Sequence, residues 1–386
     1  MRILYHHRTR AQGVEGVHIR GVVNALRRLG HQVRVVSPPG TPLEGYYDIQ
    51  QSVPRRIYDF ISDSFPQIGF ELMEIAYNLP AYHRIHDVLQ REKIDLIYER
   101  YALYGTSGVK LAGRLGIPIV LEVNVVSDLD DVRPVKMANL AKKFENLTLN
   151  RADAIVTVSN FLKRYLVSQG IEEQKIRVIP NAVNPDEFQS GDGTVIRREY
   201  NIEDSFVIGF AGRLLPWYNL DALVESIGEI AASGKDRIHL LIIGEGTLRQ
   251  ELGELIRRRN LSRHVTMTGW VEHDKISDYI NAMDVAVLSN SNPWGSPMKI
   301  FEYMVMGKPV VAPAYEPVEE IITSGENGIL FKPGDYSGFK QAVLALMDDE
   351  DLRRKIGDNA RDTVVKSHTW LRNAEKIVEI YKNLHR

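Results

Sequence analysis

The sequence contains no cysteine among its 386 residues, and its formal net charge is only -2. The first absence excludes disulfides, thiol nucleophiles and cysteine-based metal sites. The second argues against a general nucleic-acid-binding protein, which would carry a basic balance. No apolar run approaches the ~20 residues that span a bilayer, and the N-terminus lacks the apolar stretch of a signal peptide. We therefore expect a cytoplasmic protein.

Short segments rich in Ile, Val and Leu are present throughout the chain, and amphipathic stretches separate them. This alternation is typical of parallel sheets covered by helices on both faces. We predict twelve strands, at residues 2–5, 32–37, 95–98, 118–123, 154–158, 175–179, 206–210, 238–243, 265–268, 285–288, 309–312 and 328–331.

The length suits two domains of ordinary size. A turn-rich stretch from Asn181 to Asp186 marks their boundary, which gives domains over residues 1–183 and 184–365. We expect an α/β protein of two doubly wound, Rossmann-like domains. Their strand-end loops would face each other across a cleft, where open parallel sheets bind ligands.

Two glycine pairs follow predicted strands and precede predicted helices, Gly13 with Gly16 and Gly244 with Gly246. Glycine lets a backbone approach a ligand closely, and a helix N-terminus favours an anion. Neither loop has the three glycines of the dinucleotide fingerprint. Each is equally well an ordinary strand-to-helix turn.

Arg213 follows Gly212 at the carboxyl end of a predicted strand. A guanidinium there can hold a diphosphate through paired, charge-assisted hydrogen bonds. The alternative is a surface arginine paired with a nearby carboxylate.

A turn rich in Pro, Gly and Ser leads into a short predicted helix that carries Lys299 and Glu302. These two residues are three apart, so they share one helical face. A lysine beside a phosphate and a glutamate beside a ribose hydroxyl would suit a bound nucleotide. The alternative is a surface ion pair between them. The other candidate binding residues of this segment are Trp294, Gly295, Ser296, Pro297, Met298 and Ile300.

These motifs resemble those of a GT-B fold glycosyltransferase of family 4. Five further segments carry the same resemblance, namely Gly30-His31-Gln32-Val33, Val158-Ser159-Asn160, Ile179-Pro180-Asn181-Ala182-Val183, Thr268-Gly269-Trp270-Val271 and Gly307-Lys308-Pro309-Val310-Val311-Ala312. The resemblance covers nearly the whole chain. It implies a retaining enzyme without an obligatory metal or other cofactor, whose C-terminal domain binds a nucleotide-sugar donor and whose N-terminal domain binds the acceptor. It also implies that Gly269, Trp270 and Val271 flank the base, and that a helix within residues 366–386 crosses back to the first domain.

The chain departs from the family pattern at two positions. The family usually has a lysine where this chain has Tyr218, and a glutamate that contacts the donor sugar where it has Trp294. We hypothesise that Lys299 supplies the missing positive charge.

Several polar residues of the first half stand at the ends of predicted strands, namely Glu99, Arg100, Glu122 and Asn124. They can orient acceptor hydroxyls or hold the donor sugar, or they form hydrogen bonds between the domains. Asn124 stands near the position where many relatives have a histidine that contacts the donor sugar. His6, His7 and His18 are acid–base candidates, although we expect at least two of them to be ordinary polar loop residues.

Two further patterns suggest other partners. Asp128-Leu129-Asp130-Asp131 resembles a metal-binding motif of the other glycosyltransferase fold, but a solvated acidic loop is the preferred interpretation. Residues 136–151 predict a basic amphipathic helix, which either packs on the core or touches an anionic membrane that carries a lipid-linked acceptor.

The resulting prediction is a glycosyltransferase that uses a UDP- or GDP-sugar and a glycan, lipid-linked or small-molecule acceptor. No carboxylate declares itself as a covalent nucleophile, so front-side attack with retention is preferred. A nucleotide-sugar epimerase and a non-catalytic nucleotide-sugar sensor remain as alternatives. A dehydrogenase lacks its fingerprint here.

Overall fold

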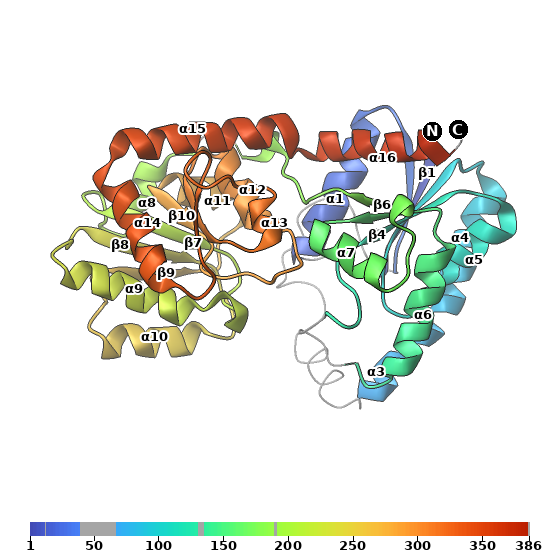
Figure 1. Cartoon of the computed structure of the whole chain (residues 1–386), viewed down its shortest axis with the longest axis horizontal. Helices are drawn as coiled ribbons and strands as arrows, with labels where there is room; N and C mark the ends of the chain where they lie inside the picture. The colour runs from blue at the N-terminus through green and yellow to red at the C-terminus, as the bar shows by residue number, and fades with distance from the viewer. Residues whose placement is uncertain (12, 39–66, 130–134, 189–190, 385–386) are drawn as a thin grey trace. The chain divides into compact units, whose positions relative to one another are not determined.

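The computed structural model describes residues 1–11, 13–38, 67–129, 135–188 and 191–384 (Figure 1). The chain forms two compact units. Unit 1 comprises Met1–Pro180 and Trp370–Arg386, and unit 2 comprises Asn181–Thr369.

Unit 1 contains a parallel sheet of order β2-β1-β3-β4-β5-β6 in its described residues. Its strands are β1 (Arg2–His6), β2 (Gln32–Val36), β3 (Leu96–Arg100), β4 (Ile119–Val123), β5 (Ala154–Thr157) and β6 (Ile176–Val178). The strand order reverses between β1 and β3, which makes this the switch point of a doubly wound sheet.

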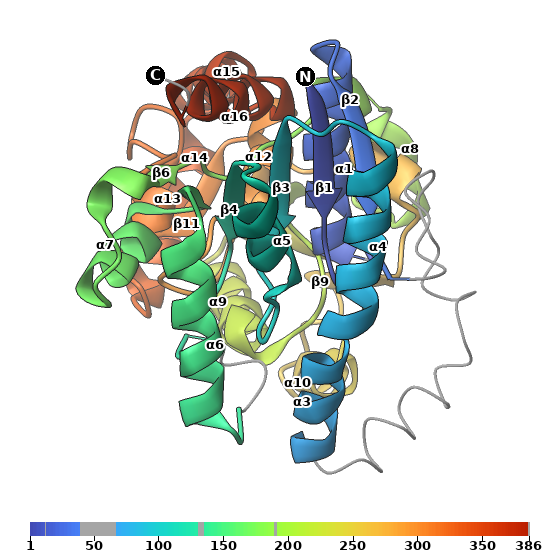
Figure 2. The same ribbon diagram turned by 90° about the vertical axis from the view of Figure 1, so that its right-hand side faces the viewer.

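Helices lie on both faces of this sheet (Figures 1 and 2). They are α1 (Gly13–Arg28), α3 (Gln67–Ala76), α4 (Asn78–Arg91), α5 (Ser107–Leu115), α6 (Ala138–Arg151), α7 (Asn160–Ser168) and α16 (Trp370–Leu384), with a 3-10 turn, η1 (Glu173–Lys175). Residues of α4 and α5 share one core cluster with Leu4 and Ile97 of the strands. Helix α16 packs on α1 so closely that a Cβ at Gly21 would lie 2.4 Å from the Trp370 ring.

Unit 2 repeats the scheme with a parallel sheet of order β12-β11-β10-β7-β8-β9. Its strands are β7 (Phe206–Ala211), β8 (Ile238–Ile243), β9 (Val265–Gly269), β10 (Val285–Val287), β11 (Val310–Pro313) and β12 (Ile329–Phe331). Here the order reverses between β7 and β10.

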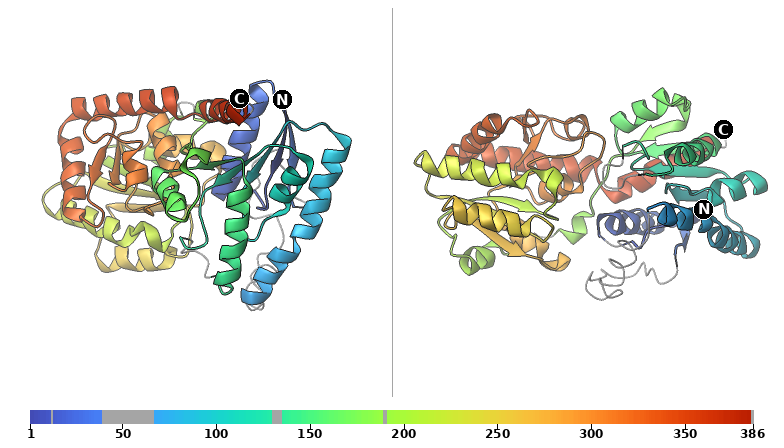
Figure 3. Two further views of the ribbon diagram at one scale, coloured as in Figure 1. Left: turned by 45° about the vertical axis from the view of Figure 1, so that its right-hand side comes forward. Right: turned by 90° about the horizontal axis from the view of Figure 1, so that it is seen from below.

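The helices of unit 2 also cover both faces of its sheet (Figure 3). They are α8 (Gly193–Glu199), α9 (Leu220–Ala232), α10 (Arg249–Arg258), α11 (Ile276–Asn281), α12 (Met298–Val305), α13 (Glu316–Glu319), α14 (Tyr336–Asp348) and α15 (Glu350–Ser367), with 3-10 turns η2 (Pro185–Glu187), η3 (Pro216–Tyr218) and η4 (His273–Lys275). Side chains alternate along each strand, so Ile208 and Val207 enter core clusters on opposite faces.

The predicted fold class is confirmed, and each of the twelve predicted strands is present within two residues of its predicted ends. The helix predicted after the first glycine loop is present, but it begins at Gly13, inside that loop, rather than at His18. Two helices, α3 and α4, lie in a stretch for which no element is predicted.

Candidate active site

The switch point of unit 2 brings two loops together at the carboxyl ends of β7 and β10. The two strands are paired neighbours, and the connections that follow them run in opposite directions. Open parallel sheets bind ligands at such a point. Gly212-Arg213 follows β7, and the turn that leads into α12 follows β10. The predicted diphosphate residues Arg213 and Lys299 therefore flank the same switch point.

The Lys299 side chain lies directly across Gly212. A Cβ added to Gly212 would come within 2.2 Å of Lys299 Cε and 2.6 Å of Nζ, and the φ of Gly212 is +148°. Since a larger residue would displace the lysine, the glycine is required for this approach. The ammonium of Lys299 is thereby held at the end of β7.

Tyr218 is the residue that holds this ammonium. Lys299 Nζ donates a hydrogen bond of 2.7 Å to the Tyr218 hydroxyl and lies 4.2 Å from the centroid of its ring. The tyrosine is fixed in turn, because its carbonyl accepts a hydrogen bond of 2.5 Å from Ser289 Oγ. Burial would raise the pKa of the Tyr218 hydroxyl, but the adjacent Lys299 charge outweighs it and the pKa is lowered.

The ionic groups at this edge have no partners of opposite charge in the described residues. Arg213 is exposed and forms no hydrogen bond or ion pair there. No ion pair joins Lys299 and Glu302 in the same set, so the predicted alternative of a surface pair is wrong. Burial raises the pKa of the Glu302 carboxyl above its ordinary value. The charge of Lys299 lowers this pKa in part, and the charge of Glu187 raises it. Two cations and one carboxylate are thus left for other contacts.

Hydrogen bonds within the turn and to Asn181 fix the turn before α12. Asn292 Oδ1 accepts hydrogen bonds from the amides of Trp294 (3.3 Å) and Gly295 (2.5 Å). Ser296 is buried and contacts Asn181 twice, once through its hydroxyl and once through its carbonyl. Pro297 then occupies the N-cap position of α12.

Two of the predicted binding residues on α12 direct their side chains into the core. Met298 and Ile300 are both buried. Only their backbone groups are left for a ligand, and the first amides of a helix have no acceptor within the helix.

The glycine loops beside the switch point pack against one another. A Cβ at Gly244 would lie 2.2 Å from the Gly212 carbonyl oxygen, and one at Gly246 would lie 2.3 Å from that of Leu214. Contact between loops therefore gives these glycines a packing role, and their role toward a ligand stays a prediction. At the end of β9, Gly269 is buried, Val271 is half-buried and Trp270 is 45% exposed.

In unit 1, Glu122 is the centre of a buried ionic cluster at the end of β4. Its Oε1 pairs with Arg100 at 2.5 Å and accepts a hydrogen bond from Asn124 Nδ2 at 2.8 Å. Its Oε2 lies 2.9 Å from His18 Nε2 and accepts a 3.0 Å hydrogen bond from the Tyr98 hydroxyl. Burial alone would raise the pKa of Glu122, but His18 and Arg100 lower it well below its ordinary range.

A second carboxylate–histidine pair lies at the unit 1 switch point. His6 and Glu99 are register partners on β1 and β3, and His6 Nδ1 lies 2.9 Å from Glu99 Oε1. His6, His7 and His18 are 1%, 0% and 6% exposed. Our prediction that at least two of these histidines are ordinary polar loop residues is therefore wrong. His6 and His18 are buried, and each lies beside a carboxylate carried by a strand of the same unit.

The first glycine loop is also explained by packing. A Cβ at Gly16 would lie 1.9 Å from the Ala11 carbonyl oxygen, while Gly13 is exposed with a φ of +68°. The loop allows α1 to begin close to the end of β1, and this places His18 beside Glu122.

Other predicted features fall outside these two clusters. Asp130 and Asp131 of the acidic motif lie outside the described residues, and among the described ones no three His, Asp or Glu side chains gather as metal ligands would. Helix α6 buries Glu145, which pairs with Lys142 at 3.1 Å. No helix in the described ranges is long and apolar enough to cross a membrane.

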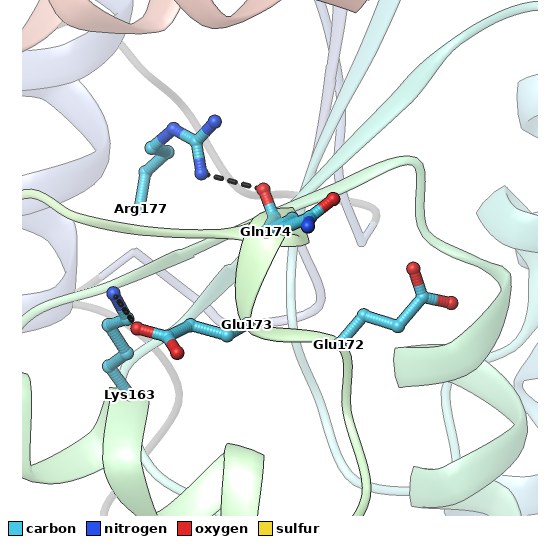
Figure 4. Close-up of a pocket in the computed structure, with 5 residues that line it drawn as sticks. All are labelled: Lys163, Glu172, Glu173, Gln174 and Arg177. Atoms are coloured by element: carbon cyan, nitrogen blue, oxygen red, sulfur yellow. Dashed lines mark hydrogen bonds and ion pairs between the residues drawn. The ribbon is translucent and has the colours of Figure 1, made fainter.

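A shallow hollow of unit 1 contains none of the predicted site residues (Figure 4). Lys163 pairs with Glu173 at 2.9 Å, and Arg177 donates to the Gln174 carbonyl at 2.6 Å. Because these contacts are made within the hollow itself, we assign it no ligand.

Both halves of the chain match known protein families. Residues 13–187 match the family described as Glycosyltransferase Family 4, and residues 192–363 match Glycosyl transferases group 1. The chain is 27% identical over 312 residues to the glycosyltransferase MJ1178 of Methanocaldococcus jannaschii, a match that covers 80% of this chain and 81% of that protein. It is 23% identical over 244 residues to MJ1069 of the same organism, covering 63% of this chain and 62% of that protein.

Solved structures share the fold. The crystal structure of Anabaena Alr3699/HepE in complex with UDP superposes with a TM-score of 0.74 at 18% sequence identity, and the match covers 99% of this chain and all of the other. The fold is thus GT-B, as predicted. With both halves matched, the chain belongs to glycosyltransferase family 4 and is a glycosyltransferase.

Proposed function

We propose that this glycosyltransferase takes its sugar from a nucleotide-diphosphate sugar whose pyrophosphate is bound by Arg213, Lys299 and the first turn of α12. The observation that carries the proposal is the position of Lys299. Its ammonium is held over Gly212 at the switch point, and within the described residues its contacts are a tyrosine hydroxyl and aromatic rings rather than a carboxylate. A cation held in place without a counter-ion suits an anionic ligand.

This arrangement would favour the chemical step. When the bond between the sugar C1 and the phosphate oxygen breaks, negative charge grows on the departing diphosphate. Cations and helix amides already in position stabilise that charge without further reorganisation. In front-side attack the acceptor oxygen bonds to C1 on the same face, and the departing phosphate receives the acceptor proton. The anomeric configuration is then retained.

The nucleoside would lie along the same edge. We assign the ribose hydroxyls to Glu302, whose carboxylate forms no hydrogen bond in the described part of the chain. Gly269, Trp270 and Val271 would flank the base, with Gly244 and Gly246 beside them. HepE has been crystallised with UDP and with UDP-glucose, so uridine donors are the first to test and GDP-sugars the second.

The acceptor would be bound by unit 1, at the edge that carries the two carboxylate–histidine pairs. We assign it to the vicinity of Gly13 and Gly16 and of His6, His18, Glu99, Arg100 and Glu122. Asn124 donates its amide N–H to Glu122, which leaves its carbonyl oxygen to accept a hydrogen bond from the donor sugar. The acceptor is proposed as a glycan or a lipid-linked sugar, and the exposed basic residues of α6, Lys143 and Arg151, are then the ones to test for membrane contact.

The test is calorimetric titration of the intact protein with UDP, GDP and their sugars. Lys299→Ala should weaken binding of the preferred nucleotide by ~1.5–3 kcal/mol, the scale of a charged hydrogen bond, or roughly tenfold to 150-fold. Lys332→Ala is the matched control, since it removes an exposed lysine of the same unit. Equal affinity of the Lys299 variant and the control would refute the pyrophosphate site.

The stereochemistry needs a separate experiment. Once a donor and an acceptor are found, proton NMR of the first product formed gives the configuration of the new bond. Retention is expected, and an inverted product would contradict front-side attack.

A further inference from the structure

Asn181, the first residue of unit 2, is joined by two hydrogen bonds to the turn that precedes α12. Its backbone amide donates to Ser296 Oγ at 3.1 Å, and its side-chain Nδ2 donates to the Ser296 carbonyl at 2.6 Å. The two residues are 9% and 6% exposed. Because both hydrogen bonds are buried, they restrict the turn to one position.

This turn sets the start of α12. Pro297 follows Ser296 at the N-cap position, and its carbonyl accepts the Ile300 amide at 3.3 Å. Lys299 is the second residue of the helix. A displacement of Ser296 would therefore move both the first amides of α12 and the lysine that lies over Gly212.

The segment that leads out of unit 2, at His368 and Thr369, also contacts α12. The rings of His368 and Phe301 have centroids 5.3 Å apart, and the His368 carbonyl accepts the Val183 amide at 3.1 Å. Thus the chain that enters unit 2 at Asn181 and the chain that leaves it at Thr369 are joined to each other and to this helix.

We propose that Asn181 is a positioning residue that holds the turn at Ser296, and with it Lys299, in the geometry that binds pyrophosphate. The proposal rests on the function proposed above. A nucleotide bound at α12 stabilises the position of the turn at Ser296. By thermodynamic linkage it then also stabilises the segment at Asn181, which holds the turn in that position. Nucleotide binding at the helix should accordingly be felt at residues 181–183.

The experiment compares Asn181→Ala with Asn327→Ala in the intact protein. Asn327 is the matched control, because it is 6% exposed in the same unit and its Nδ2 also donates to a backbone carbonyl, that of Ile321. Both variants should lose similar amounts of thermal stability. Well below the melting temperature, Asn181→Ala should weaken UDP binding by roughly fivefold to tenfold, while Asn327→Ala should bind like the unaltered protein.

Hydrogen exchange supplies a readout that a purely structural role would not change. In the unaltered protein, UDP should slow exchange of the peptide that covers residues 179–184. In Ser296→Ala, which keeps the backbone but removes one acceptor, that protection should be reduced. This second variant also serves if Asn181→Ala does not fold.

The two proposals fail in different ways. If Lys299→Ala binds UDP weakly while Asn181→Ala and Ser296→Ala bind it normally, only the positioning role of Asn181 is overturned. If Lys299→Ala also binds normally, the pyrophosphate site itself is wrong. Equal weakening in Asn181→Ala and Asn327→Ala would likewise overturn the positioning role, because it would reflect a general loss of stability.

Discussion

Both sheets carry charged residues at their carboxyl edges, but those around Glu122 in unit 1 are paired with one another, while those at the switch point of unit 2 form no ion pair in the described part of the chain. In unit 1, Glu122 is buried and is satisfied by Arg100, His18 and neutral donors. In unit 2, Arg213, Lys299 and Glu302 form no ion pair within the described ranges. One edge has its charges neutralised by folding, and the other keeps them available to a ligand.

This difference separates stability from binding. A buried charge with partners costs much to disrupt, because removing one member leaves the others desolvated and unpaired. A charge without a partner contributes little to folding and can interact strongly with an ion that arrives later. Substitutions at the unit 1 edge should therefore act on stability more than on nucleotide affinity, and those at the unit 2 edge on nucleotide affinity more than on stability.

The largest expected effect comes from removing the centre of the unit 1 cluster. Glu122→Ala should lower the free energy of unfolding of unit 1 by ~3–5 kcal/mol, because Arg100 and His18 lose their buried counter-ion. Glu302→Ala is the corresponding change in unit 2 and should shift stability by less than about 1 kcal/mol. Urea unfolding, followed by hydrogen exchange of peptides from each unit, measures both. Equal losses would remove the proposed difference between the edges.

Acid pH should sharpen the same comparison. Burial lowers the pKa of His7 in unit 1 and of His239 in unit 2, each to about 4. Above pH 6.5 both histidines are neutral whether folded or unfolded. Below pH 6.5 these histidines bind protons in the unfolded chain but not in the folded one. The free energy of unfolding therefore falls between pH 6.5 and pH 4, by about 3 kcal/mol for each histidine.

Below about pH 4.5 unit 1 should lose a further contribution from Glu122, because the pKa of this buried carboxyl is lowered and its stabilisation disappears as it is protonated. Hydrogen exchange of each unit between pH 7 and 3.5, corrected for intrinsic rates, tests this. His7→Gln should flatten the pH dependence between 6.5 and 4 in unit 1 only, and His239→Gln in unit 2 only. An unchanged slope in unit 1 of the His7 variant would contradict the argument.

The sequence predicts the sheets well because each buried strand is a local pattern. Ile238–Ile243 is apolar apart from His239, and every residue of it is buried, so neither its neighbours nor its partners are needed to recognise it. The position of Arg213 at the edge of the unit 2 sheet could be predicted for a similar reason, since residues just after parallel strands gather at one edge. Lys299 lies on the helix that the turn after the neighbouring strand β10 leads into.

The contacts that organise the site could not be predicted in the same way. Asn181 and Ser296 are 115 residues apart, and no periodicity relates them. The buried histidines were misjudged because their carboxylate partners come from other strands. Helix α3 was missed for another reason: its buried residue is Glu71, while Ile68 and Leu72 are about half exposed, which reverses the usual amphipathic pattern.

The smallest effect should come from Tyr218, which tests whether Lys299 is held in place or merely present. Tyr218→Phe keeps the ring that faces the ammonium and removes only the hydroxyl that accepts its 2.7 Å hydrogen bond. We expect UDP affinity to fall by about 1 kcal/mol, or roughly fivefold, because the lysine must then be ordered when the ligand binds. Tyr82→Phe is the control, since its hydroxyl contacts Arg114 on unit 1. Unchanged UDP binding in Tyr218→Phe would mean that the hydroxyl does not position Lys299. Tighter binding would mean that the hydroxyl competes with the nucleotide for the ammonium, and either result would contradict the positioning role of Tyr218.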